Sequence, residues 1–326
     1  LKYLTTDVYS VSNDIAYSNL PKDLLSRKYY LDWSYHSNDT FYVERLLVPN
    51  DTKKRKLYFT KDFLSSLLYE YSWNQDCGEI ISKDKINVRP KHFLFNDIGV
   101  IYNIKHGPLI CSDSSNSILW KNTDFIFHHS IEKDENGNVW ACGLSKFDLE
   151  TYNNLKYGAI PFYIVLVDYK TGKTLFAKSI IDILEKSNLN WMLTWKSLKE
   201  APNDYHHLND LQPILEDNLF SKKGDLLISL REMNMIFLYD INLDTVKFYT
   251  FNLSNAQHDV DIYNDSCISV FSNNSYNKNS DDYTNSIEIL NLINNKKRTF
   301  HKEKFKKFKI NTSHQGLCEI IDKNTF

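Results

Sequence analysis

Short apolar runs with polar residues at many alternate positions recur from about residue 91 onward. Each run has about the length of one strand and ends at Asn, Asp or Gly, the pattern of half-buried strands joined by tight turns. The turns "DENGN" and "YKTGK" carry the Asn and Gly that hairpins require. The runs group into sets of four, whose first members are "KHFLFND", "HHSIEKD", "HLNDLQPIL" and "HDVDIYN". A fifth set begins at "HQGLCEIID".

The sets repeat along the chain. Their last strands end near Trp120, Phe176, Phe248 and Phe300, at intervals of 56, 72 and 52 residues. The longest interval contains an insertion near residues 180–202 with a partly helical pattern. Four-stranded units that repeat at roughly 40–50 residues are typical of β-propellers, whereas a β-sandwich gives short strands without such a repeat. We therefore predict an all-β fold, a propeller with four-stranded blades.

Residues 1–90 are less regular. "FYVERLLVPNDTKKRKLYFT" predicts two strands around the turn "PNDT", and "TKDFLSSLLYEYSW" predicts a short amphipathic helix. We expect a strand-rich segment over 1–90, partly outside the propeller or contributing to it, and the propeller over 91–326. The chain begins at Leu1 rather than Met and stops within a strand pattern, so we expect truncation at both ends. Six blades result if 1–90 supplies one and the missing C-terminus completes another.

Composition narrows the function classes. The chain has 326 residues, of which 39 are basic and 41 acidic, and a net charge of −2. This balance argues against a surface for nucleic acid or anionic membranes. No apolar run reaches the roughly 18 residues that a membrane span needs. The five cysteines have no C-x-x-C or other metal-binding spacing, and their number leaves the compartment and disulfide state open.

Histidines recur at the starts of the sets. In a propeller blade the first strand lines the central channel, and the turn between the second and third strands lies on the same face of the disc. The residues in these places are His128, His129, His206, His207, His258 and His314, together with Arg231 at the end of a second strand. Because side chains alternate along a strand, only one of two adjacent histidines can face the channel. We expect His129, His207 and His258 to face it, and His128 and His206 to face neighbouring strands or a loop.

This residue set favours an anion over a metal. A single histidine at a strand start is most often a structural hydrogen-bonding group, and three histidines can bind zinc. An arginine in the same cluster opposes a cation. Histidine and arginine together supply donors suited to sulfate, phosphate or carboxylate. We therefore predict an anion site without a metal at one rim of the channel.

The motifs "HHSIEKDENGNVW", "HLND", "DLLISLR" and "QHDVDI" with "ISVFSNN" occur in this order over roughly residues 92–280. In this combination the sequence resembles the bacterial arylsulfotransferase family, which does not use a nucleotide sulfate donor. The resemblance implies a six-bladed propeller and a ping-pong reaction through a sulfohistidine, with an aryl sulfate donor, a phenolic acceptor and no cofactor. It also implies an extracytoplasmic, periplasmic or secreted location. This chain shows no signal segment, and its oligomeric state stays open.

The resemblance assigns roles residue by residue. His258 corresponds to the nucleophile, and His207, Arg231 and His129 to groups that hold the sulfuryl oxygens or neutralise the departing phenolate. Asn209 shares a face with His207 and is expected to orient a ligand or a histidine. His128 and His206 are expected to bind substrate beside it.

Two departures from the family pattern are visible. Ser272 replaces the aspartate of the family's "FDN", and the loop from Arg231 to His258 is short. Two other functions fit the same rim. A non-catalytic propeller could bind a small anion or a sulfated ligand there. A metal-assisted lyase or lactonase would need carboxylates or a dense shell of histidines around a metal in the channel. Asp210 and Asp261 are available, but neither lies at the start of a first strand.

Overall fold

The computed structural model divides into two compact units, residues 1–89 and 90–326, and each is described by itself. The residues that the structure describes are 28–29, 43–44, 55–61, 66–74, 77–86, 90–104, 107–113, 117–146, 156–194, 204, 206–251, 253–274, 284–307, 312, 316 and 318. His314 lies outside them, as does most of the expected fifth set. Within them, no helix is both long and apolar enough to cross a bilayer.

The first unit contains two small antiparallel sheets. Strand β1 (Lys28–Tyr29) pairs with β2 (Val43–Glu44), and a second sheet has the order β3 (Arg55–Lys61), β4 (Ser66–Asn74), β5 (Cys77–Ile86). Strands therefore lie on both sides of "PNDT", but they belong to different sheets. The helix predicted from "TKDFLSSLLYEYSW" is wrong, because β4 occupies its second half. In this strand Leu67, Tyr69, Tyr71 and Trp73 recur with period two, and that strand period prevails over the helical spacing of the preceding residues.

The second unit is built from the predicted strand sets. Its first sheet contains β6 (Pro90–Phe95), β7 (Val100–Ile104), β8 (Gly107–Ser112), β9 (Ile118–Lys133), β10 (Val139–Leu144), β11 (Phe162–Val167) and β12 (Thr174–Ser179), in sequential antiparallel order. The second contains β13 (Leu208–Pro213), β14 (Leu226–Leu230), β15 (Met235–Asp240) and β16 (Thr245–Phe251). The third contains β17 (His258–Asn264), β18 (Cys267–Ser272), β19 (Ser286–Asn291) and β20 (Lys297–Phe300). The all-β prediction is confirmed.

One strand joins the first two predicted sets into a single sheet. β9 runs without interruption, so its first half pairs with β8 and its second half with β10. No Gly or Pro separates Trp120 from His128, which allows the chain to stay extended between the sets. β9 therefore serves as the last strand of one set and the first strand of the next.

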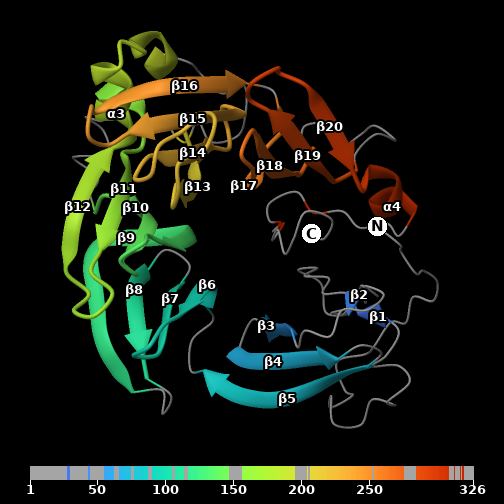
Figure 1. The fold of residues 1–326 in the computed structure, drawn as a ribbon. Coiled ribbons are helices and arrows are strands. Elements are labelled where there is room, and N and C mark those ends of the chain that lie inside the picture. Colours follow the sequence, from blue (N-terminus) through green and yellow to red (C-terminus); the bar gives the residue numbers. More distant parts are fainter. Residues whose placement is uncertain are drawn as a thin grey trace. The chain divides into compact units, whose positions relative to one another are not determined.

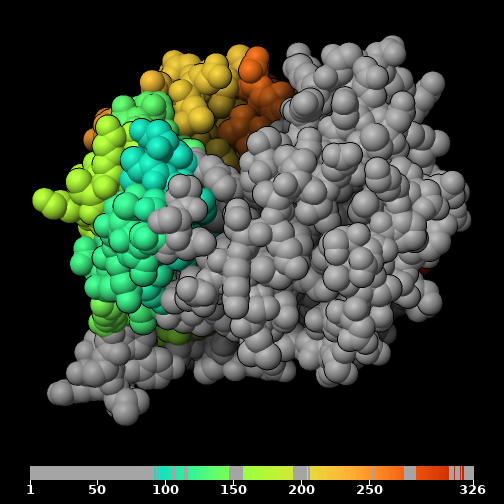
Figure 2. All heavy atoms as spheres, turned by 90° about the horizontal axis from the view of Figure 1, so that it is seen from below, coloured from blue at the N-terminus to red at the C-terminus, as the bar shows by residue number. Residues whose placement is uncertain are grey.

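The first strands of successive sets lie side by side. β6 and β13 are both neighbours of β9, and β17 is a neighbour of β13. Side chains fasten these strands together: Ser130 Oγ accepts from Leu211 N at 3.1 Å, and Asn209 Nδ2 donates to the Gln257 carbonyl oxygen at 2.6 Å. In Figure 1, β13 and β17 lie on the inner side of their sheets, and β16 and β20 on the outer side. Figure 2 shows the same three sheets as successive green, yellow and orange parts of the surface.

Apolar side chains fill the spaces between the sheets. Ile164 of the first sheet and Ile228 and Phe237 of the second are fully buried in one cluster, and Leu238 and Ile268 belong to another cluster between the second and third sheets. Burying one such side chain stabilises the fold by about 1.5–3 kcal/mol. The sheets are thus held by their faces as well as by their inner strands.

The insertion at residues 180–202 is partly helical, as predicted. Helix α3 (Ile180–Lys186) begins after Ser179, whose hydroxyl accepts from Asp182 N at 3.0 Å, and the 3-10 helix η3 (Asn190–Thr194) follows. Their apolar residues join the first cluster. Residues 195–203 lie outside the described part. The remaining described helices are η2 (Lys156–Gly158) and α4 (Lys302–Lys307).

Four cysteines, Cys111, Cys142, Cys267 and Cys318, are buried and free of disulfides in the described part of the chain. Such cysteines behave as small apolar core residues. The side chain of Cys77 is not described.

Candidate functional site

Three histidine rings from three successive inner strands converge. The ring centroid of His129 lies 5.0 Å from that of His207 and 6.0 Å from that of His258. His129 lies in β9, His207 immediately precedes β13, and His258 begins β17. Because the inner strands are neighbours, residues far apart in sequence meet at the same end of the sheets. We call His129, His207 and His258 the histidine cluster.

Irregular backbone at the strand starts helps to aim these rings. The pairing register shifts at the start of β9's second half, of β13 and of β17. His129 and His207 have φ values of 55° and 38°, in the left-handed region that non-glycine residues rarely adopt. Such bulges and unusual backbone angles re-aim side chains and are common at functional sites.

His258 is held through one ring nitrogen. Its Nδ1 lies 2.6 Å from Asn273 Oδ1, and the amide nitrogen of Asn273 donates to the Thr312 carbonyl oxygen at 3.0 Å. Because that amide nitrogen points at Thr312, Oδ1 is the atom that faces His258, and Nδ1 must carry the hydrogen. Nε2 then has a lone pair, and it is buried with no hydrogen-bond partner among the described residues. Burial, followed by the charge of Arg231, lowers the pKa of His258 to about 3, so its ring is neutral near pH 7.

His207 has a different partner on the same ring atom. Its Nδ1 lies 2.6 Å from Asp204 Oδ2, and both side chains are partly exposed. The Phe162 ring lies beside His207, with its centroid 6.1 Å away. The arrangement is a histidine backed by a carboxylate, with Nε2 as the remaining nitrogen for proton exchange.

The alternation rule fails for His128 and His129. Nδ1 of His128 lies 2.8 Å from Nδ1 of His129, and the two rings meet edge to face. The left-handed backbone at His129 turns its side chain toward its neighbour instead of to the opposite face of the strand. Burial and the neighbouring histidines hold the pKa of His129 well below its ordinary value.

His128 and His206, predicted to bind substrate, are buried, with exposed fractions of 4 % and 1 % beside 6 % for His258. The ring of His128 packs against Phe162, at 5.4 Å between centroids. Burial lowers the pKa of His206 to about 4.

Arg231 lies next to His207 but has an internal partner. It follows β14, its backbone N–H donates to the His207 carbonyl oxygen at 3.0 Å, and its guanidinium is ion-paired with Glu232. Arg231 is buried, and its charge contributes to the low pKa of His258. The positive charge of Arg231 therefore acts on the His258 ring.

Gln257 is a site residue that sequence reasoning missed, although the "QH" motif contains it. Its Nε2 lies 3.1–3.2 Å from Ser229 Oγ and from the carbonyl oxygens of Leu230 and Met235. These atoms flank the turn that carries Arg231. The carbonyl oxygen of Gln257 accepts from Asn209, so the Asn209 amide reaches the backbone beside His258, and its Oδ1 is buried without a described partner. Gln257 and Asn209 thus join the turn of Arg231, β13 and the start of β17.

In the part of the chain that the structure describes, carboxylates and histidines do not form a metal-binding group. Asp210 accepts from Val260 N at 2.5 Å in the buried interface between β13 and β17, where burial raises its pKa to about 6. Among the described residues, no group of three or more His, Cys, Asp or Glu is arranged to hold a metal ion.

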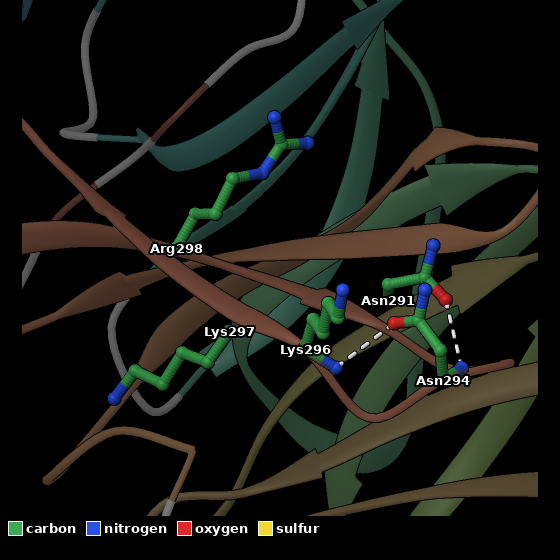
Figure 3. A pocket seen from close by; sticks show the side chains of 5 residues that line it. All are labelled: Asn291, Asn294, Lys296, Lys297 and Arg298. Atoms are coloured by element: carbon green, nitrogen blue, oxygen red, sulfur yellow. Dashed lines mark hydrogen bonds between the residues drawn. The ribbon is translucent and has the colours of Figure 1, made fainter.

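A surface hollow at the β19–β20 turn is separate from the histidine cluster. It is lined by Asn291, Asn294, Lys296, Lys297 and Arg298. The strand register places Asn291 next to Cys267, at the other end of β18 from Phe271, which pairs with His258. Figure 3 shows the long side chains of Lys297 and Arg298 diverging, while the two asparagines are engaged with the turn backbone. The hollow is the outside of a tight turn.

Residues 96–326 match the family described as arylsulfotransferase (ASST). The chain therefore belongs to the arylsulfotransferase family. Among curated proteins, no significant sequence match was found.

Several solved structures are similar in part. A Bacteroides caccae protein of unknown function shares 14% identity over 76% of this chain and 72% of its own, with a TM-score of 0.46. A catalytically inactive virginiamycin B lyase from Staphylococcus aureus with quinupristin shares 9% over 78% and 72%, with a TM-score of 0.40. Kuenenia stuttgartiensis hydrazine synthase shares 9% over 77% and 68%, with a TM-score of 0.43. At these values the likenesses do not bear on the function of this chain.

Proposed function

We propose that this chain transfers a sulfuryl group from an aryl sulfate ester to an acceptor phenol by a ping-pong mechanism through a sulfohistidine at His258. Membership of the arylsulfotransferase family supports the reaction class. The observation that carries the assignment is the state of His258, whose Nε2 is unprotonated, buried and unpartnered among the described residues, with a cationic Arg231 close by. A neutral imidazole held in this way is a competent nucleophile.

The first half-reaction forms one bond and breaks one. Nε2 of His258 attacks sulfur, the N–S bond forms, and the bond from sulfur to the phenolic oxygen breaks. The departing oxygen takes a proton from Nε2 of His207. Sulfuryl transfer, like phosphoryl transfer, concentrates charge on peripheral oxygens, and in this proposal Arg231 and His129 stabilise that charge.

The second half-reaction reverses these steps with another phenol. The acceptor hydroxyl gives its proton to His207 and its oxygen attacks the sulfur. The N–S bond then breaks and returns the lone pair to His258. Atoms and charge balance without a metal or another cofactor.

The rest of the assignment follows the same proposal. The adjacent inner strands support a β-propeller in which residues 91–326 form most of the blades, six in the complete fold, while residues 1–90 form a strand-rich segment. Aryl sulfates and phenols are the proposed substrates, and the proposed location is extracytoplasmic.

A second function is supported by the ion pair between Arg231 and Glu232. If the guanidinium stays with Glu232, the cluster has lost a free cation, and the chain would bind a small anion or sulfated ligand at the same rim without transferring it. The two functions differ in whether a covalent intermediate forms.

The test is the intact mass of the protein after incubation with 4-nitrophenyl sulfate. We expect a gain of one sulfuryl group in the wild-type chain and none in His258→Asn. Loss of the group on addition of a phenol would establish the ping-pong order. A folded wild-type chain that binds the ester but never gains mass would overturn the catalytic proposal and favour the binding function.

A further inference from the structure

Within the histidine cluster, His258 and His207 have chemically different hydrogen-bond partners at Nδ1. Nδ1 of His258 meets the amide oxygen of Asn273, and Nδ1 of His207 meets a carboxylate oxygen of Asp204, each at 2.6 Å. The geometry of the two contacts is the same, and only the charge of the partner differs. An amide oxygen accepts a hydrogen bond without adding charge, whereas a carboxylate adds a full negative charge that favours a protonated ring.

We propose that Asn273 and Asp204 are positioning residues that give the two imidazoles different roles. Asn273 holds His258 as the neutral Nδ1–H tautomer, which can attack sulfur. Asp204 orients and supports His207 as the group that carries the proton. This inference rests on the proposed function. It deepens it by explaining why two neighbouring histidines act differently.

Asn273 is itself held rigidly. It is fully buried, and its amide nitrogen donates to the Thr312 carbonyl oxygen. Asn285 donates to that same oxygen and to the Asn273 carbonyl oxygen, each at 2.9 Å. A flipped Asn273 amide would present its NH₂ group to His258 and lose the bond to Thr312. The surroundings therefore select the orientation that leaves Nε2 of His258 unprotonated.

The charges around His258 act in the same direction. Arg231, with its partner Glu232, lies on the β14–β15 turn, and the rings of His207 and His129 approach from β13 and β9. A carboxylate at position 273 would oppose Arg231 and favour a protonated His258, which cannot attack sulfur. An amide keeps the nucleophile neutral.

The groups around His207 differ. Its carboxylate partner lies three residues earlier, and the His129 ring faces it from β9. Burial and the neighbouring histidines, which include His128 and His92, keep His129 neutral as well. His207 is therefore the member of the cluster that combines a carboxylate partner with partial exposure to solvent.

The first test swaps the amide for an acid. In both proteins the rate of covalent labelling by 4-nitrophenyl sulfate should fall as the pH is lowered, by up to tenfold per pH unit. In Asn273→Asp we expect this fall to begin at a higher pH than in the wild type. The matched control is Asn285→Asp, which disturbs the same contact with Thr312 but does not touch His258. An equal shift in both variants, or none in Asn273→Asp, would overturn the role of Asn273.

The second test reads the tautomer directly and needs no activity. In long-range ¹H–¹⁵N spectra of histidine-labelled protein, we expect His258 to be protonated at Nδ1 only. Asn273→Leu should give a mixture of tautomers, and Asn285→Leu should keep the wild-type pattern. A proton on Nε2 in the wild-type protein contradicts the inference. If Asn273→Leu does not fold, the wild-type spectrum and Asn273→Asp still decide it.

The third test varies the leaving group. Asp204→Asn keeps the hydrogen-bond acceptor but removes the charge, so it should slow labelling by phenyl sulfate by on the order of 10²-fold, and labelling by 4-nitrophenyl sulfate much less, because nitrophenolate needs little protonation. Asp210→Asn, which removes the charge of a buried carboxylate three residues after His207, should leave the ratio of the two rates unchanged. Equal slowing with both esters would make Asp204 structural.

These outcomes separate the inference from the proposed function. Without labelling of the wild-type protein, the proposed function fails while the tautomer spectrum still tests Asn273. With normal labelling and unchanged pH and leaving-group dependences in the variants, the function stands and the inference fails.

Discussion

The backbone N–H of Arg231 donates to the carbonyl oxygen of His207 over 3.0 Å, so the "HLND" and "SLR" motifs lie on one rung between β13 and β14. Neither residue can shift along its strand without the other. The motif pair is therefore a single structural unit that places a cation beside a histidine.

Arg231→Lys should keep the fold and lose most of the labelling activity. A lysine ammonium cannot reproduce the planar fork of the guanidinium, which could contact Glu232 and a sulfuryl oxygen together. Loss of one such donor lowers rates by on the order of 10²–10³-fold. The measurements are the labelling rate with 4-nitrophenyl sulfate and the urea midpoint of unfolding.

Glu232→Gln is the matched variant for Arg231. It frees the guanidinium from its internal anion, so we expect aryl sulfate to bind at least as tightly as to the wild type. Unchanged labelling in Arg231→Lys together with lowered stability would show that the ion pair is structural only.

His207→Asn and His129→Asn should still form the sulfo-enzyme, but slowly. Neither ring supplies the bond to sulfur, so each loss removes a proton donor or charge stabilisation, about 10²–10³-fold, rather than the whole reaction. Time courses of intact mass would measure both rates beside that of His258→Asn. Accumulation of modified enzyme in His258→Asn at a near-normal rate would transfer the role of nucleophile to His207.

Gln257→Ala should lower both stability and activity. It leaves the carbonyl oxygens of Leu230 and Met235 without their buried donor, at a cost of about 1–3 kcal/mol, and loosens the turn that carries Arg231. Gln212→Ala, which removes a half-buried glutamine whose amide donates to the Pro213 carbonyl oxygen, should change stability by less than about 0.5 kcal/mol. The urea midpoints and labelling rates of the Gln257 and Gln212 variants are compared. A Gln257 variant that behaves like the Gln212 variant would contradict the prediction.

Strand positions could be predicted from the sequence because alternation and turn residues are local signals. The predicted run "HDVDIYN" corresponds to β17, and "HLNDLQPIL" contains β13. The helix expected from "TKDFLSSLLYEYSW" was wrong because a period-two run follows directly after residues with helical spacing. The joining of two strand sets by β9 was also missed, since the absence of a turn residue is a weak signal.

The sequence could predict that His129, His207 and His258 lie near one another, because the first strands of repeated units begin at the same end of the fold. Their hydrogen-bond partners were not predictable. Asn273 and Asp204 act through contacts that depend on a bulge, on a residue with left-handed backbone and on a distant carbonyl oxygen. None of these features produces a repeating pattern in the sequence. Likewise, the edge-to-face contact of His128 with His129 breaks the alternation from which their faces were inferred.

Buried neutral histidines should make the protein sensitive to acid. Burial lowers the pKa of His258 to about 3 and that of His206 to about 4, and also holds that of His129 low, whereas unfolded histidines titrate near roughly 6.5. Between these values the unfolded state binds more protons than the native state. The free energy of unfolding must then fall as pH falls through this window. Asp210 acts oppositely, because its pKa is raised to about 6 and it takes up a proton in the native state. It is one group against these three histidines and His301, whose pKa burial also lowers.

We therefore expect the urea midpoint of the wild-type protein to decrease steadily from pH 7 to pH 5. Each net proton contributes a slope of about 1.4 kcal/mol per pH unit at full effect. His206→Asn should reduce the slope of stability against pH by an amount equivalent to up to one bound proton, without affecting the nucleophile. Asp210→Asn should increase the slope, because it removes the group that acts in the opposite direction. A midpoint that stays constant or rises toward pH 5 would show that these histidines are protonated in the native protein, and a protonated His258 could not serve as the nucleophile.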